Sequence, residues 1–226
     1  MQWALVTVGG LGESVKAIED RSTVVLAGAF NPAILVPQWV AIHGLGHPAG
    51  QDFQVEMLAP VGGTGQTRFT FDGISYSAGF KNFMLHVDGT QIAQCERAIM
   101  AVANVLGQLP HTPVTGIGFN FGFLVEEPGA ALLALMTTHD GLTDSFDGEP
   151  EVVARRWGNT VKWEQAIVSV DCELAGGQAI VAFNFHYSTD SANAAEQILR
   201  AGGVFEKHQQ RAIAAAQTLT GQELEV

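Results

Sequence analysis

The feature that most constrains the fold of this chain is a strict two-residue alternation in the stretch VTGIGFNFGFLV, residues 114–125. One set of alternate positions carries glycine and one asparagine, and the other carries Ile117, Phe119, Phe121 and Phe123. Because successive side chains of a β-strand point to opposite faces, this pattern predicts a strand with one buried face. The glycine face invites close approach by a helix, another backbone or a ligand.

The Phe-Asn-Phe core of this stretch occurs again in VAFNFHY, residues 181–187. Here too the alternation places the phenylalanines on one face and the asparagine on the other. Gly176 and Gly177 join this segment to the preceding apolar run, which predicts a β-hairpin. Asn120 and Asn184 therefore either hydrogen-bond within a polar layer or face solvent. The repeated Phe-Asn-Phe sequence has two interpretations, an ancient duplication or two aromatic strands of independent origin.

Helical periodicity is clearest in two segments. Over residues 91–107, apolar side chains recur at spacings of three and four, which predicts one amphipathic helix. A long helix is also expected over 191–219, where Gly202 and Gly203 weaken the middle by about 1 kcal/mol each and favour a kink. A shorter helix is expected to begin at the Asn31–Pro32 pair. The remaining pattern predicts a short apolar helix over 128–138 and strands over 2–8, 22–30, 52–58, 67–71, 74–80, 83–87, 151–158, 161–174 and 178–187.

These elements predict an α+β protein: antiparallel sheet with the two long helices packed on it. The order strand–strand–helix occurs at 67–107 and again at 161–219, which favours two related lobes. The acidic stretch HDGLTDSFDGEPE between them predicts a linker or surface loop. We therefore expect an N-terminal lobe over 1–140 and a C-terminal lobe over 150–226, with one continuous domain as the alternative.

The charge balance excludes several classes of partner. The net charge is −12, from 11 Lys and Arg against 23 Asp and Glu, and the basic residues are scattered along the chain. A nucleic acid or an anionic membrane needs clustered cations, so neither is an expected partner. The chain has two cysteines, too few for a disulfide framework, and its start MQWALVTVGG lacks the basic and long apolar regions of a secretion signal. We expect a cytoplasmic protein without a bound cofactor.

The 191–219 segment also carries the best candidate for an interface. Its apolar positions recur in a heptad-like order that includes Ile198, Phe205, Ala212 and Leu219. Such a stripe packs either in the chain's own core or against another protein. Only 15% of the residues are charged, and no catalytic motif is complete. These features favour a non-catalytic function, in which the chain binds a protein partner or assembles with its own copies as a homo-oligomer.

The sharpest candidate for chemistry is the pair His43 and His47 in HGLGHP. Two histidines four residues apart on one face of a helix can share a zinc ion. Gly44 stands where a zinc peptidase carries its glutamate. A third ligand would come from elsewhere, with the candidates Asp52, His86 and His111. The alternative interpretation is a helix end followed by an exposed histidine.

An enzyme or small-molecule binder with a cleft between the lobes is the second function that the sequence allows. The two histidines and the face of Asn120 and Gly122 are its expected lining. Acidic residues of the C-terminal strands could also meet across the 151–187 sheet as an acid–base pair, the candidates being Glu151, Glu164, Asp171 and Glu173. No G-x-S-x-G motif is present, and Cys95 and Cys172 fall at apolar positions, so no nucleophile is indicated.

Overall fold

The computed structural model describes residues 15–18, 21–59, 66–88, 90–136 and 151–225. The predicted strand at 2–8 and nearly all of the predicted acidic loop lie outside these ranges. The helices are α1 (Pro37–Leu45), α2 (Ile92–Gln108), α3 (Ala130–Leu135), α4 (Ala192–Leu199) and α5 (Val204–Thr220). The strands are β1 (Val15–Ala17), β2 (Thr23–Gly28), β3 (Glu56–Leu58), β4 (Arg68–Phe71), β5 (Ile74–Ala78), β6 (Asn82–His86), β7 (Val114–Val125), β8 (Ala154–Trp163), β9 (Ala166–Ala175), β10 (Gln178–Ser188) and β11 (Leu224–Glu225).

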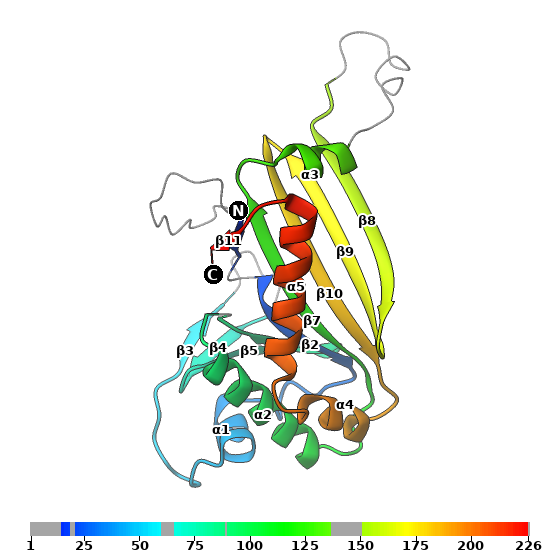
Figure 1. Ribbon diagram of the computed structural model, residues 1–226. Coiled ribbons are helices and arrows are strands. Elements are labelled where there is room, and N and C mark those ends of the chain that lie inside the picture. Colours follow the sequence, from blue (N-terminus) through cyan, green and yellow to red (C-terminus); the bar gives the residue numbers. More distant parts are fainter. Residues whose placement is uncertain (1–14, 19–20, 60–65, 89, 137–150, 226) are drawn as a thin grey trace.

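The main strands form one antiparallel sheet in the order β3-β4-β5-β6-β2-β7-β10-β9-β8 (Figure 1). β1 pairs antiparallel with the end of β7, and β11 pairs parallel with β1. β7 is flanked by β2 and β10 and is the central strand. Within the described ranges, β3 and β8 are the outer strands at the two ends of this order.

The alternation in the central strand is confirmed. β7 covers the predicted residues 114–125, and Phe119, Phe121 and Phe123 are at most 3% exposed. Phe121 packs on Phe205 of α5, with ring centroids 5.3 Å apart. The second Phe-Asn-Phe copy lies in β10, directly beside the first, so both copies build the same core.

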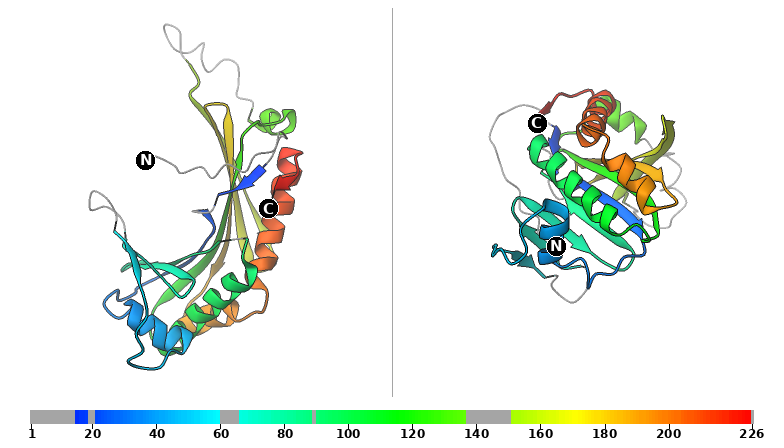
Figure 2. Two further views of the ribbon diagram at one scale, coloured as in Figure 1. Left: turned by 90° about the vertical axis from the view of Figure 1, so that its left-hand side faces the viewer. Right: turned by 90° about the horizontal axis from the view of Figure 1, so that it is seen from below.

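All helices of the described chain lie on one face of the sheet (Figure 2). α5 runs along β7 and β10, and α2 packs against α1, α4 and α5. The sheet bends, so that β3–β5 stand at an angle to β8–β10 and the face without helices looks into this angle (Figure 2). We call the two faces the helix side, which holds the core, and the open side.

The helix expected over 191–219 is two helices, α4 and α5. Gly203 lies at the break with a φ of 69°, a left-handed conformation that glycine adopts without steric cost. Glu96 of α2 stabilises the start of α5, because its Oε1 accepts hydrogen bonds from the backbone N–H groups of Phe205 and Glu206 at 3.1 and 3.5 Å. α2 and α5 each have 17 residues.

Two other boundaries differ from the prediction. The first helix begins at Pro37, because Asn31 accepts a hydrogen bond from the N–H of Ala33 at 3.1 Å in a turn and caps no helix. β8 and β9 meet at a turn around Glu164, whose φ is 55°, several residues later than expected. β8 is exposed over most of its length, and an exposed strand lacks the apolar alternation that marks its ends.

The two expected lobes share the sheet. β7 precedes the acidic loop and β10 follows it, and the two strands pair over ten positions, from Ala179 opposite Val125 to Ser188 opposite Gly116. The division into 1–140 and 150–226 stays a prediction, and this pairing favours the alternative of one continuous domain.

Candidate functional site

A row of polar side chains crosses the open side of the sheet. Residues directly opposite each other on paired antiparallel strands point to the same face. From β3 to β8 the opposed residues are Glu56, Thr70, Ser75, His86, Thr23, Asn120, Asn184, Ser169 and Thr160. Each strand of the main sheet therefore contributes one polar residue to this row, which we call the polar row.

Hydrogen bonds join the middle of the polar row into an amide chain. Asn184 Nδ2 donates to Asn120 Oδ1, and Asn120 Nδ2 donates to Thr23 Oγ1 at 3.0 Å. Of the two interpretations of these asparagines, the polar layer is the observed one. Because each amide donates to the next group in this order, Asn184 Oδ1 is an acceptor that has no hydrogen-bond partner among the described residues.

Two adjoining hollows lie on the open side. The central hollow has a volume of about 280 Å³ and is lined by Arg21, Thr23, Asn120, Asp171, Ala182 and Asn184, among others. The outer hollow, nearer to β8, has a volume of about 430 Å³ and includes Arg21, Arg156, Gly158, Asp171, Glu173 and Ala182 in its lining. Arg21, Asp171 and Ala182 belong to both hollows.

Glycines make room for the side chains around these hollows. A Cβ atom at Gly122 would lie 2.6 Å from Cβ of Arg21, and one at Gly158 would lie 2.7 Å from Oδ1 of Asp171. Further along β7, a Cβ at Gly116 would lie 2.6 Å from the His186 ring. The prediction for the glycine face named a helix, another backbone or a ligand, whereas the close neighbours of Gly116 and Gly122 are side chains of the same chain.

The charged groups of the hollows differ in their pairing. Arg156 forms an ion pair with Glu173 at 3.3 Å. By contrast, the guanidinium of Arg21 and the carboxylate of Asp171 have no hydrogen-bond or ion-pair partner in the part of the chain that the structure describes. Of the four predicted acidic candidates, Asp171 and Glu173 line the outer hollow, whereas Glu164 pairs with Lys207 of α5 at 2.8 Å. Glu151 lines neither hollow.

His47 takes part in a contact between three elements. Its Nε2 lies 3.1 Å from Oδ2 of Asp72 in the β4–β5 turn, and the same carboxylate binds the guanidinium of Arg97 on α2. The hydrogen bond from Arg97 holds the pKa of Asp72 below its usual value of 3.8. This arrangement ties α1, the β4–β5 turn and α2 together.

His43 and His47 do not share one helical face. α1 ends at Leu45, and Gly46 has a φ of 76°, so His47 follows the helix, as in the alternative interpretation. The ring of His43 packs on Trp39, with centroids 4.4 Å apart. Among the described residues, no group of three or more His, Cys, Asp or Glu side chains is placed to hold a metal ion.

Both cysteines are buried and reduced. Burial raises the pKa of Cys95 to about 12 and also raises the pKa of Cys172. The nucleophilic form of cysteine is the thiolate, so neither residue is an activated nucleophile at neutral pH.

The four residues expected at an interface lie on the face of α4 and α5 that packs on the chain itself. Phe205 and Ala212 are completely buried, and Ile198 and Leu219 are half-buried against the same core. The buried part of the stripe therefore packs within the chain itself, and its role as an interface stays a prediction.

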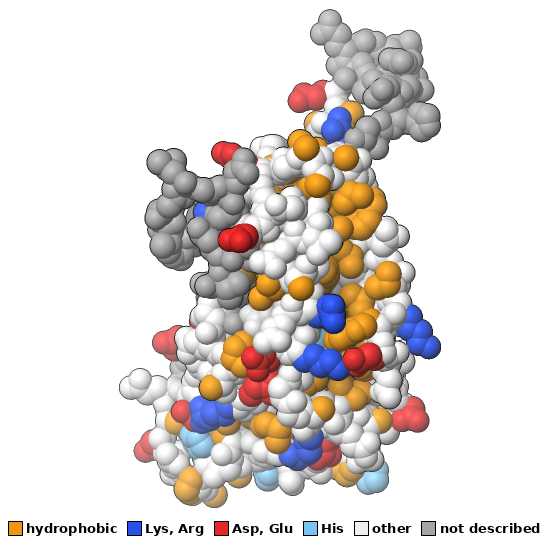
Figure 3. All heavy atoms as spheres, in the orientation of Figure 1, with side chains coloured by type: hydrophobic (Ala, Val, Ile, Leu, Met, Phe, Trp, Pro, Cys, Tyr) orange, Lys and Arg blue, Asp and Glu red, His pale blue; other side chains and the backbone are white. Residues whose placement is uncertain are grey.

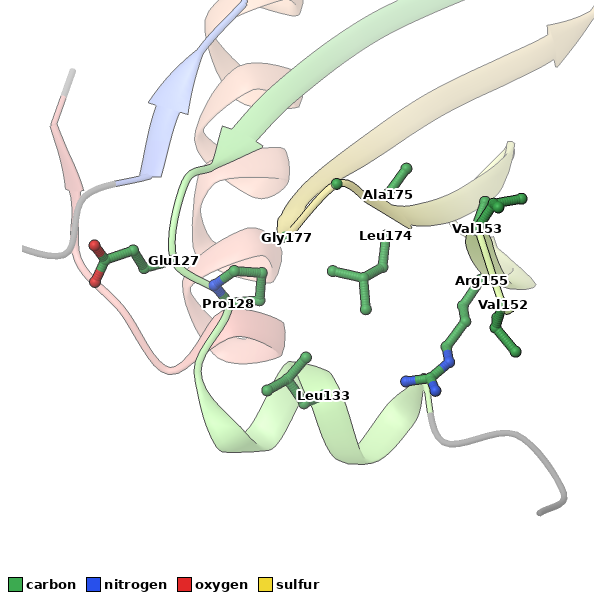
Figure 4. Close-up of a pocket in the computed structure, with 11 residues that line it drawn as sticks. Glu127, Pro128, Leu133, Val152, Val153, Arg155, Leu174, Ala175 and Gly177 are labelled. Carbon is green, nitrogen blue, oxygen red and sulfur yellow. The ribbon is translucent and has the colours of Figure 1, made fainter. Parts of the chain in front are cut away.

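A third hollow of about 430 Å³ lies where α3, the start of β8 and the β9–β10 turn meet (Figure 4). Leu133 and Leu174 point into it, and Arg155 extends toward the end of α3 (Figure 4). Of the lining residues, Glu127 and Arg155 are the charged ones. A mainly apolar hollow of this kind lacks the convergent polar groups that orient a ligand.

β8 offers a different kind of surface. It has ten residues and pairs, among the described strands, with β9 alone, so its outer edge presents unpaired backbone groups. Figure 3 shows a band of apolar side chains on the helix side, beside α5. On β8 and β9 the apolar residues of this side that stay exposed or half-buried are Trp157, Val161, Trp163, Val170 and Leu174. We call the outer edge of β8 and these five residues the β8 surface.

Sequence reasoning located part of this site. Asn120, Gly122 and Asn184 stood out because a polar or small residue interrupted an aromatic strand. Arg21 and Thr23 were missed, because they reach the site only through the pairing of β2 with β7, which local patterns do not encode. A usable signal was the recurrence of polar residues at alternate positions of most strands.

A comparison of the chain with protein-family models and with curated proteins finds no match. In the part of the chain that the structure describes, no helix has both the length and the apolar character needed to cross a bilayer. The function is therefore inferred from the residues and their geometry.

Proposed function

We propose that this protein acts without catalysis, by associating with a second copy of itself through β8. The observation that carries the proposal is a ten-residue outer strand whose free edge pairs with no other described strand and whose neighbouring apolar residues are exposed. An outer strand of this length is a template for a further strand, and proteins that stay monomeric usually keep such edges short, bulged or covered.

The residue order of β8 supports pairing with itself. In an antiparallel pair around a two-fold axis at Thr160, residues equally far from Thr160 lie opposite each other. Trp157 then faces Trp163 of the second copy, and Lys162 faces Gly158, so no two cations of β8 oppose each other. Aromatic pairs across two strands are stabilising. An axis one residue earlier would set Arg156 against Lys162, so the repulsion between these cations favours the axis at Thr160.

The apolar part of the β8 surface fits the same arrangement. Strand pairing around this axis keeps the helix sides of both copies on one side of the joined sheet. The apolar bands beside the two α5 helices then become neighbours. Val161, which is 52% exposed in the single chain, gains apolar contacts. Burial of such side chains contributes roughly 25 cal/mol per Å² of apolar surface.

A cysteine at the axis tests the pairing. Thr160→Cys places two thiols directly opposite, with Cα atoms about 4.5–5.5 Å apart, a separation that a disulfide spans. Under mild oxidation this variant should form a covalent dimer. The matched control is Lys162→Cys on the same strand and face, whose two copies lie about 13 Å apart in this register and should not crosslink. Equal crosslinking of the two variants would contradict the proposed register.

A charge on the apolar band tests the association without crosslinking. Val161→Lys adds a fourth cation to β8 beside Arg155, Arg156 and Lys162, so the two strands should repel each other. We expect the dimer to weaken at least tenfold, measured by light scattering across a dilution series. Phe80→Lys makes the same change at a residue that is 78% exposed at the far end of the sheet and should leave the dimer intact. A wild-type chain that is monomeric at all concentrations would refute the proposal.

A further inference from the structure

The central hollow lies on the open side, whereas the apolar part of the β8 surface lies on the helix side, so self-association does not account for it. Its volume of about 280 Å³ is near the lower end of the range for small-molecule sites. Its floor is formed in part by Ala182, and Gly122 lets Arg21 lie close to β7. A hollow of this size suits a molecule about as large as an amino acid.

Two charged groups of opposite sign face this hollow without neutralising each other. Arg21 comes from the residues just before β2, and Asp171 comes from β9. No ion pair joins them, and neither is paired with another described residue. A ligand with one negative and one positive group would satisfy both at once. An anion alone would meet Asp171, and a cation alone would meet Arg21.

The amide chain adds a third group of fixed direction. Because Asn184 donates to Asn120 and Asn120 donates to Thr23, the oxygen of Asn184 is the free end of the chain. Thr23 is 8% exposed, and its burial fixes the position of this row of hydrogen-bonded amides. The hollow thus presents a hydrogen-bond acceptor in addition to a cation and an anion.

We propose that the central hollow binds a small zwitterion of the amino-acid type. Its carboxylate lies at Arg21, its ammonium group lies at Asp171, and a further N–H group donates to Asn184 Oδ1. Arg21 is suited to the carboxylate because a guanidinium can donate two parallel hydrogen bonds to its two oxygens. The net charge of −12 adds a general repulsion of anions, so selective binding of an acid depends on Arg21.

Ligand-observed NMR with free amino acids tests this site. The probes are glycine, L-alanine, L-glutamine, L-glutamate and L-lysine at about 10 mM, which detects Kd values of about 1 mM. At least one should bind the wild-type chain. Its carboxamide derivative lacks the negative charge and its N-acetyl derivative lacks the positive charge, and each should bind at least tenfold more weakly.

Two variants test which residue binds the carboxylate of the ligand and which binds its ammonium group. Arg21→Gln should bind the amino acid and its carboxamide equally weakly, and Asp171→Asn should no longer distinguish the amino acid from its N-acetyl form. Both residues are exposed, so both variants should keep the wild-type circular dichroism. Arg211→Gln and Asp190→Asn remove the same charges outside the hollow and should bind as the wild type does. Failure of every probe, or binding that both hollow variants leave unchanged, would overturn the proposal.

Discussion

At the scale of single residues, His208 is a buried polar group with both ring nitrogens in use. It is 1% exposed and stacks on Phe119 at 4.6 Å between ring centroids. A carbonyl can only accept, so Nδ1 donates to the carbonyl of Val204, and Nε2 lies 2.8 Å from the hydroxyl oxygen of Tyr187, from which a neutral ring accepts. Burial lowers the pKa of His208 below its ordinary value of 6.5.

The lowered pKa predicts that mild acid destabilises the fold. Below about pH 6.5 the unfolded chain takes up a proton at His208 that the folded chain does not, so the free energy of unfolding falls as the pH falls. The slope is at most about 1.4 kcal/mol per pH unit for one group. His208→Phe should flatten this dependence in urea unfolding between about pH 7.5 and about pH 5.5.

The exposed histidine His111 provides the control for this prediction. His111→Phe should retain the wild-type slope, because this ring is exposed to solvent in the folded chain as it is in the unfolded chain. An unchanged slope in His208→Phe would assign the acid sensitivity to other groups. The lowered pKa of Asp72 acts in a separate window, since its contribution is present above about pH 3.8 and is lost only in stronger acid.

At the scale of elements, the start of α5 depends on a side chain from another helix. Gly203 precedes α5 and has no side chain to cap it, and Glu96 of α2 accepts the two N–H bonds instead. Glu96→Ala should therefore lower the free energy of unfolding by about 1 kcal/mol, as the loss of a helix cap usually does. Chemical denaturation measures this loss.

Glu206 allows a matched comparison for this cap. It lies in the first turn of α5 and is exposed, and among the described residues its side chain bonds only to Gln210. Glu206→Ala should lower the free energy of unfolding by less than half as much as Glu96→Ala. Equal effects would mean that negative charge near the helix start stabilises α5 and that the hydrogen bonds of Glu96 do not.

Elements with one apolar face were predictable from the sequence, and the others were not. β7 agrees with the prediction at both ends, and α2 agrees within one residue, because their apolar residues recur with a clear period. The break before α5 was marked by Gly202 and Gly203, but the decisive partner, Glu96, is distant in sequence. The turn after β8 was misplaced because both faces of that strand are largely exposed.

At the scale of the whole molecule, the pairing of β7 with β10 predicts one cooperative unfolding transition. Trp39 on α1 reports the N-terminal part, and Trp163 at the end of β8 reports the C-terminal part. Two variants, each retaining one of these tryptophans and carrying phenylalanine at the other three, should show the same urea midpoint by fluorescence. Two separate midpoints would support independent lobes over 1–140 and 150–226.

The candidate site shows the same division between local and long-range information. Asn120 and Asn184 are visible as polar interruptions of aromatic strands, and Asp171 as an acidic residue in a predicted sheet. Their meeting with Arg21 depends on the order of strands around β7, which arises from long-range packing. The polar character of the site was therefore predictable, whereas its location and its charged pair were not.

The amide pair at the centre of the sheet also has a consequence for how the chain reaches its native alignment. Moving β10 along β7 by two positions leaves phenylalanine near phenylalanine and glycine on the other face, so the aromatic contacts barely distinguish the shifted arrangement. That shift would set Asn184 opposite Gly118 or Gly122 and leave its half-buried amide without Asn120. The two asparagines thus specify the register of an otherwise repetitive strand pair. A chain that first paired β7 and β10 in another register would have to shift β10 until Asn184 lay opposite Asn120.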